Sequence, residues 1–159
     1  MALQEHLESE AAVVTTTESG AKIASISPGL AGAFLERHRV AGFPAAGNCQ
    51  AWGAFDDSPS LIAVGALGAI APPRGWAWIA VAPERRRLRV GSELMALLAS
   101  AAAARGLRYL SCQHRSNDPA FDDFVRSLGR TVGRRVNDGT AKVVIILAPT
   151  GRVLGPVPR

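Results

Sequence analysis

The sequence predicts a mixed α/β (α+β) fold, with a mostly antiparallel sheet of six to seven strands, helices on both faces and a central parallel βαβ unit. Short β-branched and apolar runs, bounded by Gly, Pro, Asn and Asp, recur along the chain as strand signals. Amphipathic stretches separate some of these runs and are long enough for crossover helices. The 159 residues, 48% hydrophobic and 19% charged, suit one globular domain, which we expect over residues 1–150. Residues 151–159 are rich in Pro and Gly, and we expect them to form an irregular tail.

The first half of the chain predicts a strand, a helix and a meander. Residues 11–17 are rich in Val and Thr, which favours a strand. Residues 27–40 predict a helix, because Ser27 and Pro28 suit the N-cap and first turn and the apolar positions recur at helical spacing. The following apolar runs, joined by turn-rich links, predict an antiparallel meander over residues 49–55, 61–70 and 76–82.

The second half predicts a crossover and then a hairpin. A helix beginning near Val90 and ending at a Gly C-cap, Gly106, leads to a strand over residues 107–113. Together with the strand before it, this helix makes a βαβ unit, so the flanking strands should be parallel. A second amphipathic helix covers residues 118–129 and closes on a glycine. The final strands, over residues 130–136 and 141–147, flank the hairpin signal Asn-Asp-Gly.

Bulk properties narrow the class of protein. Only Cys49 and Cys112 occur, with no Cys/His ligand spacing, so we expect neither a disulfide framework nor a metal site. The acidic N-terminus lacks the features of a signal peptide and no apolar run is long enough to span a bilayer, so we expect a cytoplasmic protein without a membrane partner. The net charge of +5 leaves room for an acidic ligand or nucleic acid.

The segment Glu84-Arg-Arg-Arg-Leu-Arg-Val-Gly-Ser92 places arginines just before a helix whose N-terminus is itself positive. A bound anion would relieve this repulsion, because a loop that follows a strand and opens a helix directs free backbone N–H groups at one point. Gly91 permits close approach of the backbone, and Ser92 adds a hydroxyl donor. The pattern therefore favours a ligand with a pyrophosphate; the alternative is a solvated run of charge. Neither GxxxxGK[ST] nor GxGxxG after a strand occurs.

Residues 76–129 resemble the core of the GNAT superfamily of acyl-CoA-dependent N-acyltransferases. In that family a strand ends in Val-x-Pro-Glu and is followed by Arg-Gly-x-Gly-x-Gly, a Leu-containing helix and a strand, and then an Asn-x-x-Ala. The positions that carry the resemblance are Val81, Pro83, Glu84, Arg86, Gly91, Leu94, Asn117 and Ala120. The chain departs from the motif at Arg87 and Arg89, which replace its middle glycines.

The resemblance implies an N-acetyltransferase that moves the acetyl group of acetyl-CoA, its acyl-donor substrate, directly to an amine of unknown identity. A small molecule or a protein would supply that amine, over residues 27–56. Asn117 would contact coenzyme A or, alternatively, cap its own helix. The residues that the resemblance places at coenzyme A are Ile79, Val81, Arg86, Arg87, Leu88, Arg89, Val90, Gly91, Ser92 and Asn117.

The general acid is not evident from the sequence. Many members of the family use a Tyr on the last helix, and the corresponding positions are Val125 and Phe124, which cannot donate a proton. His114 and Cys112 are the candidate catalytic residues, because strand alternation places them on one face. The alternatives are a surface histidine and a small buried cysteine.

Other readings stay open. The missing Tyr is compatible with a non-catalytic acyl-CoA-binding protein. The excess of arginine is compatible with a relative that acts on nucleic acid. Arginines that hold coenzyme A, however, would not be free to bind nucleic acid. Edge strands such as residues 142–147 could pair across a homodimer.

Overall fold

The computed structural model describes residues 15–38, 49–58, 60–85, 89–115 and 119–147. Its helices are α2 (Pro28–Arg37), α3 (Val90–Ala104) and α4 (Pro119–Ser127), with a 3₁₀ turn η1 (Pro83–Arg85). Its strands are β1 (Thr15–Thr16), β2 (Lys22–Ile26), β3 (Cys49–Phe55), β4 (Leu61–Ala71), β5 (Arg74–Val81), β6 (Tyr109–Arg115), β7 (Gly129–Asn137) and β8 (Thr140–Leu147).

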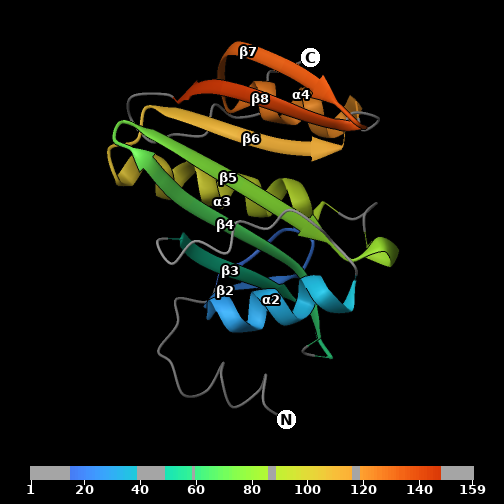
Figure 1. Cartoon of the computed structure of the whole chain (residues 1–159). Helices are drawn as coiled ribbons and strands as arrows, with labels where there is room; N and C mark the ends of the chain where they lie inside the picture. The colour runs from blue at the N-terminus through green and yellow to red at the C-terminus, as the bar shows by residue number, and fades with distance from the viewer. Residues whose placement is uncertain (1–14, 39–48, 59, 86–88, 116–118, 148–159) are drawn as a thin grey trace. The chain divides into compact units, whose positions relative to one another are not determined.

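The strands form one sheet of eight, hydrogen-bonded in the order β1-β2-β3-β4-β5-β6-β8-β7 (Figure 1). The predicted fold class is confirmed: β5 and β6 pair in parallel across the α3 connection, and β1/β2, β2/β3, β6/β8 and β7/β8 pair antiparallel. The sheet has more strands than the six to seven expected, because β2 was not recognised in the sequence.

The chain groups into two compact units. The first unit comprises Met1–Ala66 and Ala80–Leu94, and the second comprises Leu67–Ile79 and Met95–Arg159. The predicted tail, residues 151–159, lies outside the described residues. No described helix is both long and apolar enough to cross a membrane.

The first unit is built on the β1-β2-β3 ladder. The predicted helix start is confirmed, because the Ser27 side chain accepts a hydrogen bond of 3.1 Å from the Leu30 N–H and Pro28 opens α2. α2 packs against β3, and the side chains of Ile23, Phe34, Leu35 and Phe55 are buried in this unit. Of the strand predicted over residues 11–17, Thr15 and Thr16 form β1, Thr17 follows them outside the strand, and residues 11–14 lie outside the described residues.

The second unit contains the β5-β6-β8-β7 ladders, and α4 packs against β6 and β7. The predicted hairpin is confirmed: Asp138 and Gly139 adopt φ of 48° and 76°, the positive values that a two-residue turn requires. The predicted C-cap at Gly106 is confirmed as well, with φ of 78°.

Two predictions for this unit are wrong. Gly129 does not cap α4; it is the buried first residue of β7, since α4 ends at Ser127 and the chain enters the sheet directly. The strand over residues 142–147 is not at an edge, because β8 lies between β6 and β7. The exposed outer strand is β7.

Candidate functional site

The segment that the sequence singled out lies between the end of β5 and the start of α3, and its residues 86–88 lie outside the described residues. β5 ends at Val81, the Ala82 N–H donates to the Ile62 carbonyl at 2.8 Å, and η1 follows directly. In α3 the Glu93 N–H donates to the Arg89 carbonyl at 3.0 Å. The preceding N–H groups, of residues 90–92, therefore have no acceptor within the helix. A helix start with free N–H groups suits an anion.

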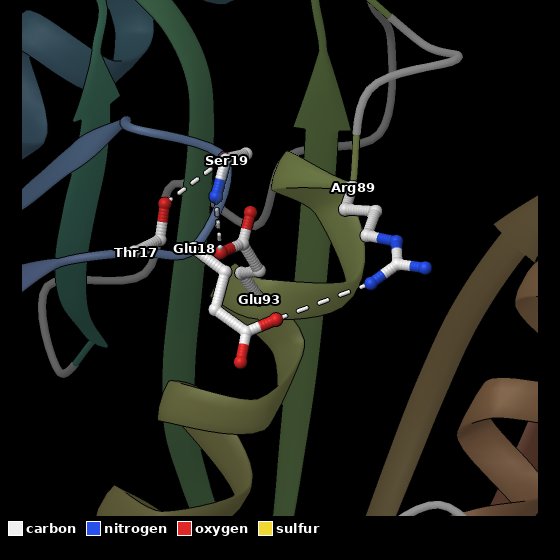
Figure 2. Close-up of polar contacts among 5 residues, drawn as sticks. All are labelled: Thr17, Glu18, Ser19, Arg89 and Glu93. Atoms are coloured by element: carbon white, nitrogen blue, oxygen red, sulfur yellow. Dashed lines mark hydrogen bonds and ion pairs between the residues drawn. The ribbon is translucent and has the colours of Figure 1, made fainter.

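Two oppositely charged side chains lie at the start of α3: Arg89, the residue before the helix, and Glu93 in its first turn (Figure 2). Arg89 is 81% exposed, and its Nη1 lies 4.0 Å from Glu18 Oε2, which is 92% exposed. An ion pair this exposed contributes little to stability, about 0–1 kcal/mol. The Arg89 guanidinium is thus held only weakly by the protein and stays accessible to a dissolved anion.

Glu93 reaches Ser19 in the turn between β1 and β2, next to Glu18, the partner of Arg89 (Figure 2). Its Oε2 accepts a hydrogen bond of 3.4 Å from the Ser19 N–H, and its Oε1 is buried without a hydrogen-bond partner among the described residues. A carboxylate in the first turn of a helix is favoured by the helix dipole. Glu93 therefore joins α3 to the β1–β2 turn.

Sequence reasoning missed Glu18, Ser19 and Glu93. The acidic residue in the first turn of a helix was a usable signal for Glu93. The contact with Ser19 joins residues far apart in the chain, and no local pattern indicates it.

The predicted coenzyme A residues fall into different parts of the structure. Within the first unit, Val81 ends β5, and Arg89, Val90, Gly91 and Ser92 are brought together around the start of α3. Val90 and Gly91 are buried, and Ser92 is half-buried. Ile79 is half-buried on β5 in the second unit. The remaining predicted residues, Arg86, Arg87, Leu88 and Asn117, lie outside the described residues.

The predicted catalytic candidates lie on β6. The Cys112 side chain is 0% exposed, and burial raises the pKa of its thiol from 9.0 to about 12. A thiol that is out of solvent and neutral favours the packing alternative over a catalytic role. The backbone of His114 pairs with Ala141, and its side chain is not among those described.

The Cys112 environment gives a direct prediction. Native protein at pH 8 should react with a thiol reagent at Cys49, which is half-buried, and much more slowly at Cys112, because the thiolate is the reactive form. Mass spectrometry of the alkylated protein locates the label, and Cys49→Ser provides the control. Rapid labelling of Cys112 in that folded variant would contradict the burial described here.

The position of the family's usual acid is apolar in the structure too. Val125 is fully buried in α4, and Phe124 is half-buried. Among the described residues, no group of three or more His, Cys, Asp or Glu could hold a metal ion.

A comparison with models of protein families finds a match. The model of the acetyltransferase (GNAT) family matches residues 26–129, a segment that includes β5, the arginine-rich sequence after it and α3. A search of curated proteins finds no match.

Solved structures share the fold at low sequence identity. The ribosomal-protein-S18-alanine N-acetyltransferase from Escherichia coli is 16% identical, with a TM-score of 0.61 over 80% of this chain and 94% of that one. A GNAT superfamily phosphinothricin acetyltransferase from Sinorhizobium meliloti, solved in complex with AcCoA, is 16% identical, with a TM-score of 0.62 over 80% of this chain and 88% of that one. An IAA acetyltransferase from Bacillus cereus is 16% identical, with a TM-score of 0.61 over 80% and 99%.

Proposed function

We propose, because this chain belongs to the GNAT family of acetyltransferases, that it transfers the acetyl group of acetyl-CoA directly to an amine. The observation that carries the proposal is the family match across the strand, turn and helix that end β5 and begin α3. The phosphinothricin acetyltransferase with the same fold was solved with AcCoA, which supports the choice of donor.

The residues at the start of α3 fit the diphosphate of coenzyme A. Arg89 offers an exposed guanidinium, which forms charge-assisted hydrogen bonds with phosphate oxygens. The N–H groups of residues 90–92 offer donors at the positive end of a helix. Of the two carboxylates described nearby, Glu93 accepts a hydrogen bond from the Ser19 N–H, and Glu18 forms only the exposed ion pair with Arg89.

The reaction needs no covalent intermediate on the protein. The neutral amine attacks the thioester carbonyl carbon, the carbon–sulfur bond breaks, the amine loses a proton and the thiolate gains one. In the proposed reaction a backbone N–H near Val81 polarises the carbonyl, as the family resemblance implies. Because Val125 and Phe124 cannot supply the proton, we assign the role of acid to His114 or to water.

A non-catalytic acyl-CoA binder is the second candidate, and the buried Val125 at the usual tyrosine position favours it. The two candidates separate in one assay. Thiol release from acetyl-CoA is followed in the presence of amines and peptides, with mass spectrometry to detect the acetylated product. An acetyltransferase releases thiol in step with product, whereas a binder is stabilised by acetyl-CoA against heat and forms no product.

A His114→Gln variant tests the acid within the same assay. If His114 donates the proton, the variant should bind acetyl-CoA with unchanged affinity and lose about 100-fold or more in kcat, as expected on removing a general acid. An unchanged kcat and pH profile would assign the proton to water instead.

A further inference from the structure

In the second unit, the strand register aligns one row of side chains across four neighbouring strands. Trp78 of β5 pairs with Gln113 of β6, Gln113 with Lys142 of β8, and Lys142 with Arg135 of β7. Cross-strand partners point to the same face of a sheet. These side chains therefore share one face, although they come from distant parts of the chain.

Further rows on this face follow by alternation. Trp76 aligns with Ser111, Val144 and Gly133, and Arg74 aligns with Tyr109, Ile146 and Arg130. We call the face that these rows form the open sheet face. Its members are Arg74, Trp76, Trp78, Tyr109, Ser111, Gln113, Arg130, Gly133, Arg135, Lys142, Val144 and Ile146.

The opposite face is the packed one. It carries Leu110, Cys112, Val143 and Ile145, all 0% exposed. Arg134, which alternates with Arg135, pairs with Asp122 of α4 at 3.3 Å, so α4 covers this face. In Figure 1 α4 lies behind β7 and β8, and the open sheet face is turned to the viewer.

The open sheet face is basic at its margins and partly apolar in its middle. Arg74, Arg130, Arg135 and Lys142 are all exposed, and no carboxylate pairs with them in the part of the chain that the structure describes. Between them, Trp76, Tyr109, Ser111, Val144 and Ile146 are half-buried. The acidic residues of α4 belong to the packed side, where Asp122 pairs with Arg126 and Arg134.

We propose that the open sheet face docks an extended acidic polypeptide segment, and that this segment carries the amine which the protein acetylates. The second half of this statement rests on the proposed function; the docking does not. Strand spacing of about 4.8 Å and a rise of about 3.3 Å per residue make the basic margin roughly 14 by 13 Å. An extended segment of about four residues spans that length, with carboxylates able to reach the cations on either side.

Charge and burial favour this occupant over others. A second copy of the chain would bring its own cations against these, which like-charge repulsion opposes. Single-stranded nucleic acid has the right charge, but it binds through bases stacked on accessible aromatic rings. Trp76 and Tyr109 are half-buried within the sheet surface, and Trp78 is only 8% exposed, so the face is a poor stacking platform.

Fluorescence anisotropy tests the docking without acetyl-CoA. The probe is a labelled eight-residue peptide of alternating Ala and Glu with a free N-terminal amine, and the comparisons are its Gln-for-Glu counterpart and an oligothymidylate of equal charge. The Glu peptide should bind, the Gln peptide should not, and added salt should weaken binding. Failure of the Glu peptide to bind, or tighter binding of the oligothymidylate, would overturn the proposal.

Adjacent residues of β7 supply matched variants. Arg135→Gln removes a cation from the open sheet face, and Arg134→Gln removes one from the packed face with the same change in net charge. Arg135→Gln should weaken peptide binding about three-fold, and the double variant Arg130→Gln with Arg135→Gln about ten-fold, as expected for exposed charge pairs. Arg134→Gln should leave peptide binding unchanged. Equal effects of Arg134→Gln and Arg135→Gln would contradict docking on this face.

The experiments distinguish a failure of the docking proposal from a failure of the proposed function. A protein that binds the acidic peptide but never acetylates it would refute its role as acceptor and leave the docking intact. A protein that acetylates neutral and acidic peptides with equal kcat/KM would retain the enzymatic function and refute the selectivity.

Discussion

Gly129→Ala is expected to lower the free energy of unfolding by about 3 kcal/mol, the upper range for forcing an atom into a packed interior. A Cβ at residue 129 would overlap the backbone oxygen of Ile146 and lie 3.0 Å from its carbonyl carbon. Because the obstacle is backbone rather than a flexible side chain, relief requires the start of β7 to move away from β8. Thermal or urea denaturation measures the loss.

Gly133→Ala on the same strand is the control. A Cβ there meets nothing within 4 Å, and Gly133 does not have a positive φ. The free energy of unfolding should change by less than about 1 kcal/mol, because alanine meets no obstacle there and restricts the unfolded chain. Equal losses for the two variants would mean that the register of β7 against β8 is not as described.

Ser92→Asp is expected to weaken acetyl-CoA binding by about 10- to 100-fold. Ser92 lies in the first turn of α3, where the proposed diphosphate binds, and a carboxylate at about 5 Å would repel it by roughly 1–3 kcal/mol at an effective dielectric constant of about 20. The same carboxylate interacts favourably with the helix dipole, so the fold should be unharmed. Isothermal titration measures the affinity.

Ser92→Asn separates charge from size. Asparagine has nearly the shape of aspartate and carries no charge, so this variant should bind acetyl-CoA within about three-fold of the parent protein if charge dominates. Equal weakening by Asn and Asp would show that the turn is sensitive to bulk, and the repulsion argument would fail.

Much of the fold could be predicted because the residues that begin and end its helices and turns act locally. Ser27 and Pro28 act within one helical turn, and Asp138-Gly139 within one hairpin. The β2 strand was missed because Lys22–Ile26 includes Ala24 and Ser25, which carry weak strand signals. Gly129 was misassigned because a glycine after a helix usually caps it, whereas here the packing of β7 against β8 requires a residue without a side chain.

The two candidate sites also differ in how far they can be predicted from the sequence. The turn before α3 is contiguous in sequence, so its arginines and Gly91 could be found by pattern. The open sheet face could not, because the alignment of Trp78, Gln113 and Lys142 depends on which strands pair and in what register. Strand pairing between distant segments is set by tertiary packing, and no single strand sequence records it.

In the proposed function, the start of α3 binds the diphosphate of the acyl donor. Isothermal titration of the parent protein with acetyl-CoA and with S-acetylpantetheine, which has the same thioester but no diphosphate or nucleotide, tests it most directly. Acetyl-CoA should bind about 100-fold or more tightly than S-acetylpantetheine, as expected for several charge-assisted phosphate contacts. Equal affinities for the two, or no heat of binding with acetyl-CoA, would contradict it.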